Sequence, residues 1–214
     1  MFYDRIDAGQ KLAFALRQYK RKKNTVVIAL PKGGVILGYA IANELHLPLD
    51  MVMVKKIGYP SNPNFIIGAV SMTGKTIDVF AKVDSRDIEK TTKIIQEQLK
   101  KNYQMYYGDT PPLNLKNKTV IVVDDGVETG RSMIVALELI IKKKPEQIIV
   151  AIPVGPTDTI KEIENYSDKV ICLQSFSPFY SIGNYYKDYS PIKDKEIKLL
   201  LSMINNHADT SYIK

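Results

Sequence analysis

The strongest constraint on the fold is an alternation of short β-branched runs with segments of helical apolar spacing. The run at residues 24–30 precedes an apolar segment at 35–45, and the run at 119–123 precedes another at 132–141. Strands that alternate with helices are joined by crossovers, which favour a largely parallel sheet. We therefore predict an α/β fold, a Rossmann-like parallel sheet flanked by helices.

The other elements follow from the same spacing rules and from turn residues. Two prolines and a glycine at residues 58–64 favour a loop, and the segment from Gln174 onward is aromatic and irregular. We expect a single domain at 1–214, a flexible loop at about 58–65 and a small hood at about 174–190. The predicted helices are 4–19, 35–45, 84–107, 132–141, 158–166 and 194–206; the predicted strands are 24–30, 49–57, 119–123, 147–152 and 169–173, with a hairpin of 66–71 and 76–80.

The net charge of +7 suggests a phosphate-bearing partner. The basic residues fall in short runs at predicted helix ends, where cations interact favourably with the helix dipole, so we do not expect nucleic acid as a partner.

Residues 1–20 lack the hydrophobic segment of a signal peptide, and no stretch is apolar enough to span a membrane. Cytoplasm is the expected location. The single cysteine, Cys172, excludes a cysteine-based metal site.

The segment 120–132, V-I-V-V-D-D-G-V-E-T-G-R-S, carries the chemistry. In an open α/β sheet, ligands bind beyond the carboxyl ends of the strands, which is where Asp124 and Asp125 stand. Gly126, Thr129, Gly130 and Ser132 then lead into a helix, and free amides and hydroxyls at a helix start suit a phosphate. Two carboxylates beside an anion site favour a ligand that also carries hydroxyl groups or a divalent metal. A sugar phosphate meets both conditions, although a simple polar turn is the alternative.

Two other phosphate-binding motifs fail on inspection. Residues 126–132 are one residue too short for the nucleotide loop G-x-x-x-x-G-K-[ST] and have Arg131 in place of lysine. Residues 31–38 have Val35 where the dinucleotide motif G-x-G-x-x-G needs its middle glycine. Kinase-like and dinucleotide-binding functions are therefore not predicted.

Segment 120–132 resembles the ribose-phosphate motif of the type I phosphoribosyltransferase family. Pro31-Lys32-Gly33-Gly34 resembles that family's pyrophosphate loop, and Lys55-Lys56 resembles the start of its mobile loop. The similarity covers roughly residues 11–189, and within the family it is greatest to a bacterial subgroup of uncertain acceptor substrate. The resemblance implies transfer of phosphoribosyl from phosphoribosyl pyrophosphate to a nitrogenous acceptor, with Mg²⁺ as cofactor.

The resemblance also implies a role for each matching residue. Lys32 and Glu128 would be catalytic, Glu128 as a base toward the accepting nitrogen, although a solvent-facing glutamate is the alternative. Asp124 and Asp125 would hold the ribose hydroxyls, and they would contact the metal only indirectly. The residues expected to bind substrate are Asp124, Asp125, Gly126, Val127, Thr129, Gly130, Arg131, Ser132, Gly33, Gly34, Lys55, Lys56 and Phe176.

The acceptor stays open at this point. Family members that take 6-oxopurines have a basic residue after the strand at 147–152, whereas this chain has Pro153-Val154-Gly155, which argues against hypoxanthine and guanine. Phe176, Phe179 or Tyr180 could stack on a flat base, and core packing is the alternative for these rings. The partners expected are small molecules, with a homodimer left open. The alternatives are a non-catalytic sensor of phosphoribosyl pyrophosphate or nucleotide, which could bind RNA through its basic surface, and a phosphatase or other sugar-phosphate enzyme.

Overall fold

The computed structural model describes residues 1–59, 62–77 and 84–208, which form two compact units. Unit 1 comprises Met1–Met51 with Pro112–Lys214, and unit 2 comprises Val52–Pro111. Each unit is described by itself. The single domain expected for residues 1–214 stays a prediction.

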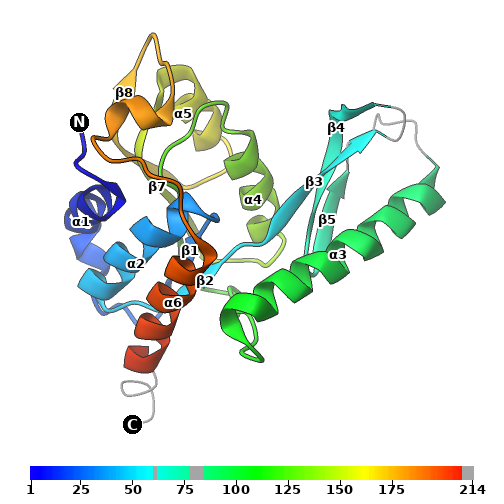
Figure 1. Cartoon of the computed structure of the whole chain (residues 1–214), viewed down its shortest axis with the longest axis horizontal. Coiled ribbons are helices and arrows are strands. Elements are labelled where there is room, and N and C mark those ends of the chain that lie inside the picture. Colours follow the sequence, from blue (N-terminus) through cyan, green and yellow to red (C-terminus); the bar gives the residue numbers. More distant parts are fainter. Residues whose placement is uncertain (60–61, 78–83, 209–214) are drawn as a thin grey trace. The chain divides into compact units, whose positions relative to one another are not determined.

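Unit 1 is built on a five-stranded parallel sheet with the strand order β2-β1-β6-β7-β8 (Figure 1). All four neighbouring pairs are parallel, which confirms the predicted fold class. β6 lies at the centre and is fully buried from Val120 to Val123, as expected for a parallel strand covered on both faces. The strands are β1 Thr25–Ala29, β2 Leu49–Met51, β6 Thr119–Val123, β7 Gln147–Pro156 and β8 Lys169–Phe176.

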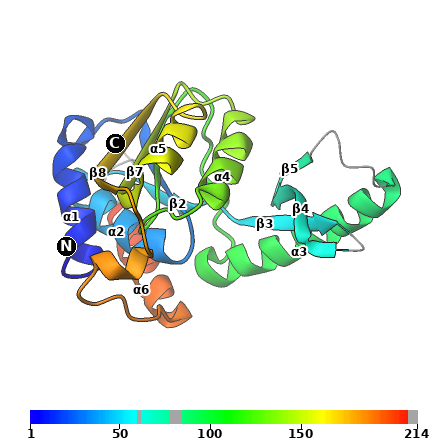
Figure 2. The same ribbon diagram turned by 90° about the horizontal axis from the view of Figure 1, so that it is seen from above.

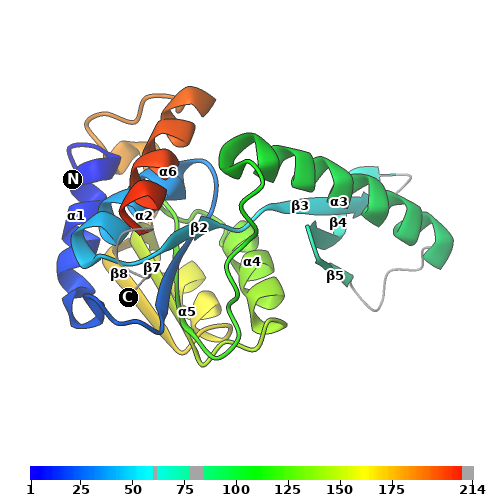
Figure 3. The ribbon, with the colours of Figure 1, turned by 90° about the horizontal axis from the view of Figure 1, so that it is seen from below.

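Helices cover both faces of this sheet. α1, α2 and α6 pack on one face, and α4 and α5 pack on the other (Figure 2 and Figure 3). Their bounds are α1 Arg5–Ala15, α2 Gly33–Leu45, α4 Arg131–Ile141, α5 Thr157–Glu164 and α6 Asp194–Ala208, with two 3-10 helices, η1 Arg17–Tyr19 and η2 Ile182–Tyr185. In the described part of the chain, no helix combines the length and apolarity needed to cross a membrane.

Unit 2 is a three-stranded antiparallel sheet packed against one long helix. The strands β3 Val54–Tyr59, β4 Asn62–Ser71 and β5 Gly74–Ile77 pair in that order, and α3 runs over Ser85–Tyr107. Leu99 and Tyr103 belong to the buried stripe of α3, since they lie four positions apart on one helix face.

Several predicted boundaries are corrected by the structure. The strand expected at 49–57 is two strands in different sheets, β2 and β3. The loop expected at 58–65 is mostly strand: residues 58–59 end β3 and residues 62–65 begin β4, while residues 60–61 lie outside the described part. Register shifts on either side of Gly58 let the ladder continue past this glycine, as in a β-bulge. The hairpin is confirmed, but β5 begins at Gly74; residues 78–80 are not described.

Two other corrections bear on the site. β8 continues to Phe176, so the first residues of the predicted hood are strand. α2 begins at Gly33 and not at Val35, so the glycine pair forms the first turn of a helix.

Candidate active site

The carboxyl end of β6 places two carboxylates side by side. The Asp124 carboxylate accepts a hydrogen bond from the Asp125 amide at 2.9 Å and another from the Gly34 amide at the start of α2. Asp124 is only partly buried as a residue, but desolvation of its carboxyl and the adjacent Asp125 charge raise its pKa well above the usual range. A carboxyl in this setting is stabilised by any ligand that brings hydroxyl donors or positive charge.

Asp125 is held by residues that are distant in the sequence. Arg5 Nε donates to Asp125 Oδ2 at 2.8 Å, and both side chains are only 10% exposed. Arg5 also donates to the Ser190 carbonyl at 2.9 Å and lies 3.9 Å from the centroid of the Tyr189 ring. The hydroxyl of Tyr186 donates to the Asp125 carbonyl at 2.6 Å. We call Arg5, Asp125, Tyr186, Tyr189 and Ser190 the Arg5 cluster.

The surroundings of the two tyrosines in the Arg5 cluster raise their pKa values. Burial and the negative charge of Asp125 raise the pKa of Tyr189 to about 12, and the same two causes raise that of Tyr186 further. Both hydroxyls are therefore protonated at neutral pH and act as donors. The cluster joins the first turn of α1 to the end of the hood and fixes the second carboxylate.

The segment after the two acids is a cup of open amides. Gly130 has φ +66 and precedes α4, which starts without a side-chain cap. Val127 donates to the Val154 carbonyl and Ile134 to the Gly130 carbonyl. For the amides of residues 128–133, which lie between them, the described residues offer no acceptor. Open amides at a helix N-terminus attract an anion, and the binding of a phosphate here stays a prediction.

The side chains around this cup are accessible. Thr129, Arg131 and Ser132 are exposed, whereas Gly126, Val127 and Gly130 are buried and shape the backbone. A Cβ on Gly130 would lie 2.7 Å from Thr159 Cγ2, so the cup depends on glycine here both for its positive φ and for its close packing.

The loop with Lys32 lies directly against the end of β6. An ideal Cβ on Gly33 would fall 2.0 Å from Asp125 Oδ2, and one on Gly34 would fall 2.4 Å from the Val123 carbonyl oxygen. The Pro31–Lys32 peptide bond is cis. Lys32 Nζ lies 3.2 Å from Asp194 Oδ1, with both side chains about half exposed. Such an exposed pair is weak and leaves Lys32 available to a ligand.

Glu128 reaches the hood. Its Oε1 accepts a hydrogen bond from the Ile182 amide at 3.2 Å, and its carbonyl accepts one from the Thr159 hydroxyl at 3.0 Å. A Cβ on Gly126 would lie 2.9 Å from Ile182 Cγ2. The structure thus brings Glu128 to the hood beside the cup, and its service as a base stays a prediction.

The hood aromatics stack mainly on one another. The Tyr185 ring lies 4.6 Å from that of Phe176 and 5.0 Å from that of Phe179, centroid to centroid. Phe176 is still 37% exposed, and Tyr180 is 76% exposed. These two rings have faces that a flat ligand could cover.

Lys55 and Lys56 belong to unit 2, on β3, and both are exposed. Lys55 Nζ donates to Gln98 Oε1 at 3.0 Å. Their binding of substrate stays a prediction.

Sequence reasoning missed Arg5, Tyr186 and Tyr189. One signal was available for Arg5: a cation in the first turn of a helix opposes the helix dipole and so calls for a local anion. Nothing in the sequence marked the two tyrosines among the many aromatics of the hood.

We expect Asp124→Asn to raise the free energy of unfolding, and to raise it more at pH 8 than at pH 4. The folded-state pKa of Asp124 lies above the unfolded value, so the folded state binds the proton more tightly. The free energy of unfolding therefore falls as the pH rises from the unfolded pKa to the folded pKa. Asparagine removes this loss and keeps an oxygen to accept a hydrogen bond. Urea denaturation at both pH values measures the effect, and a variant less stable than wild type at pH 8 would contradict it.

Asp7→Asn is the matched control. Burial alone would raise the pKa of Asp7, but hydrogen bonds from Lys11 and from the Tyr3 amide outweigh it and lower the pKa. The sign is therefore reversed: Asp7→Asn should lower the free energy of unfolding relative to wild type, and should lower it more at pH 8 than at pH 4.

A metal bound by protein side chains alone does not fit this site. Among the described residues, no group of three or more His, Cys, Asp or Glu could hold an ion. Asp124 and the open cup instead fit a cation that arrives with the phosphates of a ligand, the usual mode for Mg²⁺.

Comparisons with known proteins agree with this geometry. The profile of the phosphoribosyl transferase domain family matches residues 2–189. Proteins from two strains of Mycobacterium tuberculosis, named provisionally as phosphoribosyl transferases, are 29% identical over 206 residues, covering 94% of this chain and 46% of theirs. The chain thus spans about half the length of these curated relatives. The crystal structure of TT1426 from Thermus thermophilus is 32% identical, covers 94% of this chain and 97% of that one, and has a TM-score of 0.82.

Proposed function

The chain belongs to the phosphoribosyl transferase domain family, and from that premise we propose that it transfers phosphoribosyl from phosphoribosyl pyrophosphate to a nitrogenous acceptor and releases pyrophosphate. The observation that carries the proposal is the cup of open amides at residues 128–133, directly after two adjacent carboxylates. A ribose 5-phosphate fits both parts, because its phosphate would bind in the cup and its hydroxyls would bind to the carboxylates.

The donor would be held at both ends. The amides of residues 128–133 and the hydroxyls of Thr129 and Ser132 would bind the 5-phosphate. Asp124 and Asp125 would accept hydrogen bonds from the ribose hydroxyls, with Arg5 fixing the position of the Asp125 carboxylate. This grip leaves the anomeric carbon free to move as its bonds change.

The leaving group would meet Lys32 and the first turn of α2. As the bond from the anomeric carbon to pyrophosphate breaks, its electron pair stays with the pyrophosphate oxygen, and a new bond forms to the acceptor nitrogen. Lys32 and the amides of Gly33 and Gly34 would stabilise the charge that develops. When bound with the substrate, Mg²⁺ would share that charge. In this proposal, the Gly34 amide exchanges its hydrogen bond to Asp124 for one to the ligand.

The acceptor would lie under the hood. Phe176 has an exposed ring face that could stack on a heterocycle. The last residues of β7 include Pro153, Val154 and Gly155 and carry no cationic side chain, so an acceptor recognised through a 6-oxo group is disfavoured. The proton lost by the accepting nitrogen would pass to Glu128 or to water.

Pyrophosphate release tests the proposal directly. The protein is incubated with Mg²⁺, phosphoribosyl pyrophosphate and a panel of purine, pyrimidine and amine acceptors. Release that depends on one acceptor is the expected result. Tight binding of phosphoribosyl pyrophosphate without release for any acceptor would contradict catalysis and favour a non-catalytic sensor.

Glu128→Gln separates the two roles of Glu128. If Glu128 is the base, kcat should fall by roughly 10²- to 10⁴-fold, while KM for phosphoribosyl pyrophosphate changes little. Glutamine keeps an oxygen that can accept the hydrogen bond from the Ile182 amide, so a purely structural role predicts nearly unchanged kcat. Steady-state kinetics with the acceptor found above decides between them.

A further inference from the structure

The fold gathers three basic runs that look scattered along the sequence. β1, β6 and β7 are adjacent parallel strands, so the segments that lead into them meet at the amino-terminal edge of the sheet. The Thr119 amide donates to the Asn24 carbonyl at 2.8 Å, and the Glu146 amide donates to the Lys118 carbonyl at 2.9 Å. We call residues 20–24, 116–118 and 142–146 the basic edge.

The basic edge accounts for the charge of the whole protein. Its three segments contain nine Lys and Arg and one carboxylate, Glu146, which gives a formal charge of +8 against +7 for the chain. The rest of the molecule is therefore close to neutral. Two nearby carboxylates lower this excess by two charges: Glu44 pairs with Lys20 at 3.0 Å, and Asp168 accepts the Ile148 amide at 2.7 Å. Helices α1 and α4 end at this edge, so favourable interaction with the helix dipoles accounts for part of the excess.

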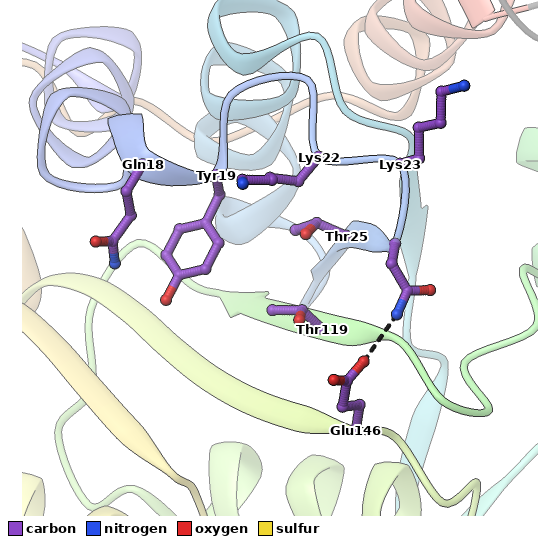
Figure 4. Close-up of a pocket in the computed structure, with 8 residues that line it drawn as sticks. Gln18, Tyr19, Lys22, Lys23, Thr25, Thr119 and Glu146 are labelled. Atoms are coloured by element: carbon purple, nitrogen blue, oxygen red, sulfur yellow. Dashed lines mark hydrogen bonds between the residues drawn. The ribbon is translucent and has the colours of Figure 1, made fainter.

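A hollow of about 640 Å³ opens in this edge (Figure 4). In Figure 4 the Lys22 amine extends toward the Tyr19 ring across the hollow, whereas Lys23 points away from it. Glu146 accepts a hydrogen bond from Asn24 Nδ2 at 2.8 Å and keeps its negative charge, which the formal charge of +8 already includes. The lining residues are Gln18, Tyr19, Lys22, Lys23, Asn24, Thr25, Thr119 and Glu146.

We propose that the basic edge binds single-stranded nucleic acid. Neighbouring strands lie about 4.8 Å apart, so the segments before β1, β6 and β7 span roughly 10 Å and present more cations than one phosphate group can meet. A chain with several phosphates meets them together, and its condensed counterions are released on binding. The Tyr19 ring would stack on a base, and the polar side chains of the hollow would contact a sugar. Proteins that bind single strands combine cations for the backbone with aromatic rings for the bases.

This surface is separate from the candidate active site. β6 runs from Thr119 at the basic edge to Val123 next to Asp124, about 15 Å at the usual strand rise. The proposal therefore does not depend on the transferase activity, and its test needs no catalysis.

The test measures the fluorescence anisotropy of a labelled 20-nucleotide poly(U) strand between 50 and 200 mM salt. Lys22→Gln, Lys23→Gln and Lys118→Gln are combined in one variant. The matched control combines Lys90→Gln, Lys93→Gln and Lys100→Gln, three exposed lysines of α3. The first variant should bind at least ten-fold more weakly than wild type at 50 mM salt. Its slope of log K against log salt should be shallower by about 2, since each neutralised phosphate of a single strand contributes about 0.7. The control should bind as wild type does.

Four outcomes would overturn the proposal. These are no binding at 50 mM salt, equal weakening in the α3 control, full displacement by phosphoribosyl pyrophosphate, and binding to anionic vesicles or inorganic polyphosphate in preference to poly(U). The second would indicate diffuse charge, the third the candidate active site, and the fourth another polyanion.

Discussion

Replacing Arg5 with methionine should lower the free energy of unfolding by about 3 kcal/mol. The Arg5 guanidinium and the Asp125 carboxylate are 2.8 Å apart and 10% exposed, so removal of one partner leaves the other charge buried and unpaired. Breaking a buried pair in this way typically costs about 3–5 kcal/mol. The variant also loses the hydrogen bond to the Ser190 carbonyl and the contact with the Tyr189 ring. Urea denaturation measures the change.

Lys11→Met is the matched control on the same helix. Lys11 pairs with Asp7 at 2.7 Å, but that lysine side chain is 50% exposed, so its loss should cost well under about 1 kcal/mol. The double variant Arg5→Met with Asp125→Asn should recover part of the loss, because neither charge is then left unpaired. Equal losses for Arg5→Met and Lys11→Met would contradict a buried pair.

Backbone hydrogen bonds act beside the Arg5 cluster to hold the hood to the N-terminal residues. The Phe2 amide donates to the Tyr185 carbonyl at 2.7 Å, and the Lys187 amide donates to the Phe2 carbonyl at 2.9 Å. These backbone bonds fix the path of the hood, and Arg5 then ties its end to the site. The N-terminal residues thereby support a site that is formed more than a hundred positions later.

The parts of the site that the sequence predicted are those formed by neighbouring residues. Residues 120–132 form a strand, two acids, a cup and a helix start in direct succession, so local chemistry sufficed to identify them. Arg5 and Asp125 are 120 positions apart, and only the packing of α1 beside the sheet joins them. The basic edge escaped prediction for the same reason, since strand order decides which loops are neighbours.

Unit 2 shows where the pattern rules failed in the fold. The apolar run at 49–57 reads as one strand, but β2 ends at Met51 and β3 pairs in another sheet. Proline and glycine at 58–64 suggested a loop, yet a register shift at Gly58 absorbs the irregularity within a hairpin. Local composition could not distinguish a break between strands from a bulge within one.

Gly34→Ala should abolish the binding of phosphoribosyl pyrophosphate, the largest functional effect that the geometry predicts. The added Cβ would lie 2.4 Å from the Val123 carbonyl oxygen and 3.0 Å from the Asp124 Cα. That carbonyl cannot move aside easily, because it also accepts the Leu30 amide at 2.9 Å. The first turn of α2 must shift instead, which separates Lys32 from the two acids that follow β6. Binding is measured by the stabilisation that the ligand gives, about 2.7 kcal/mol at a concentration of 100 Kd.

Gly9→Ala separates lost binding from lost stability. Its Cβ would lie 2.7 Å from Ala40 Cβ and 3.1 Å from Leu37 Cα, a comparable clash between α1 and α2 away from the loop. Both variants should unfold more easily than wild type, since overpacking typically costs about 1–3 kcal/mol. Only Gly34→Ala should lose the stabilisation by ligand, because only its clash displaces groups proposed to touch the pyrophosphate. If Gly34→Ala retained the full stabilisation, or Gly9→Ala lost it equally, the first turn of α2 could not be the pyrophosphate site.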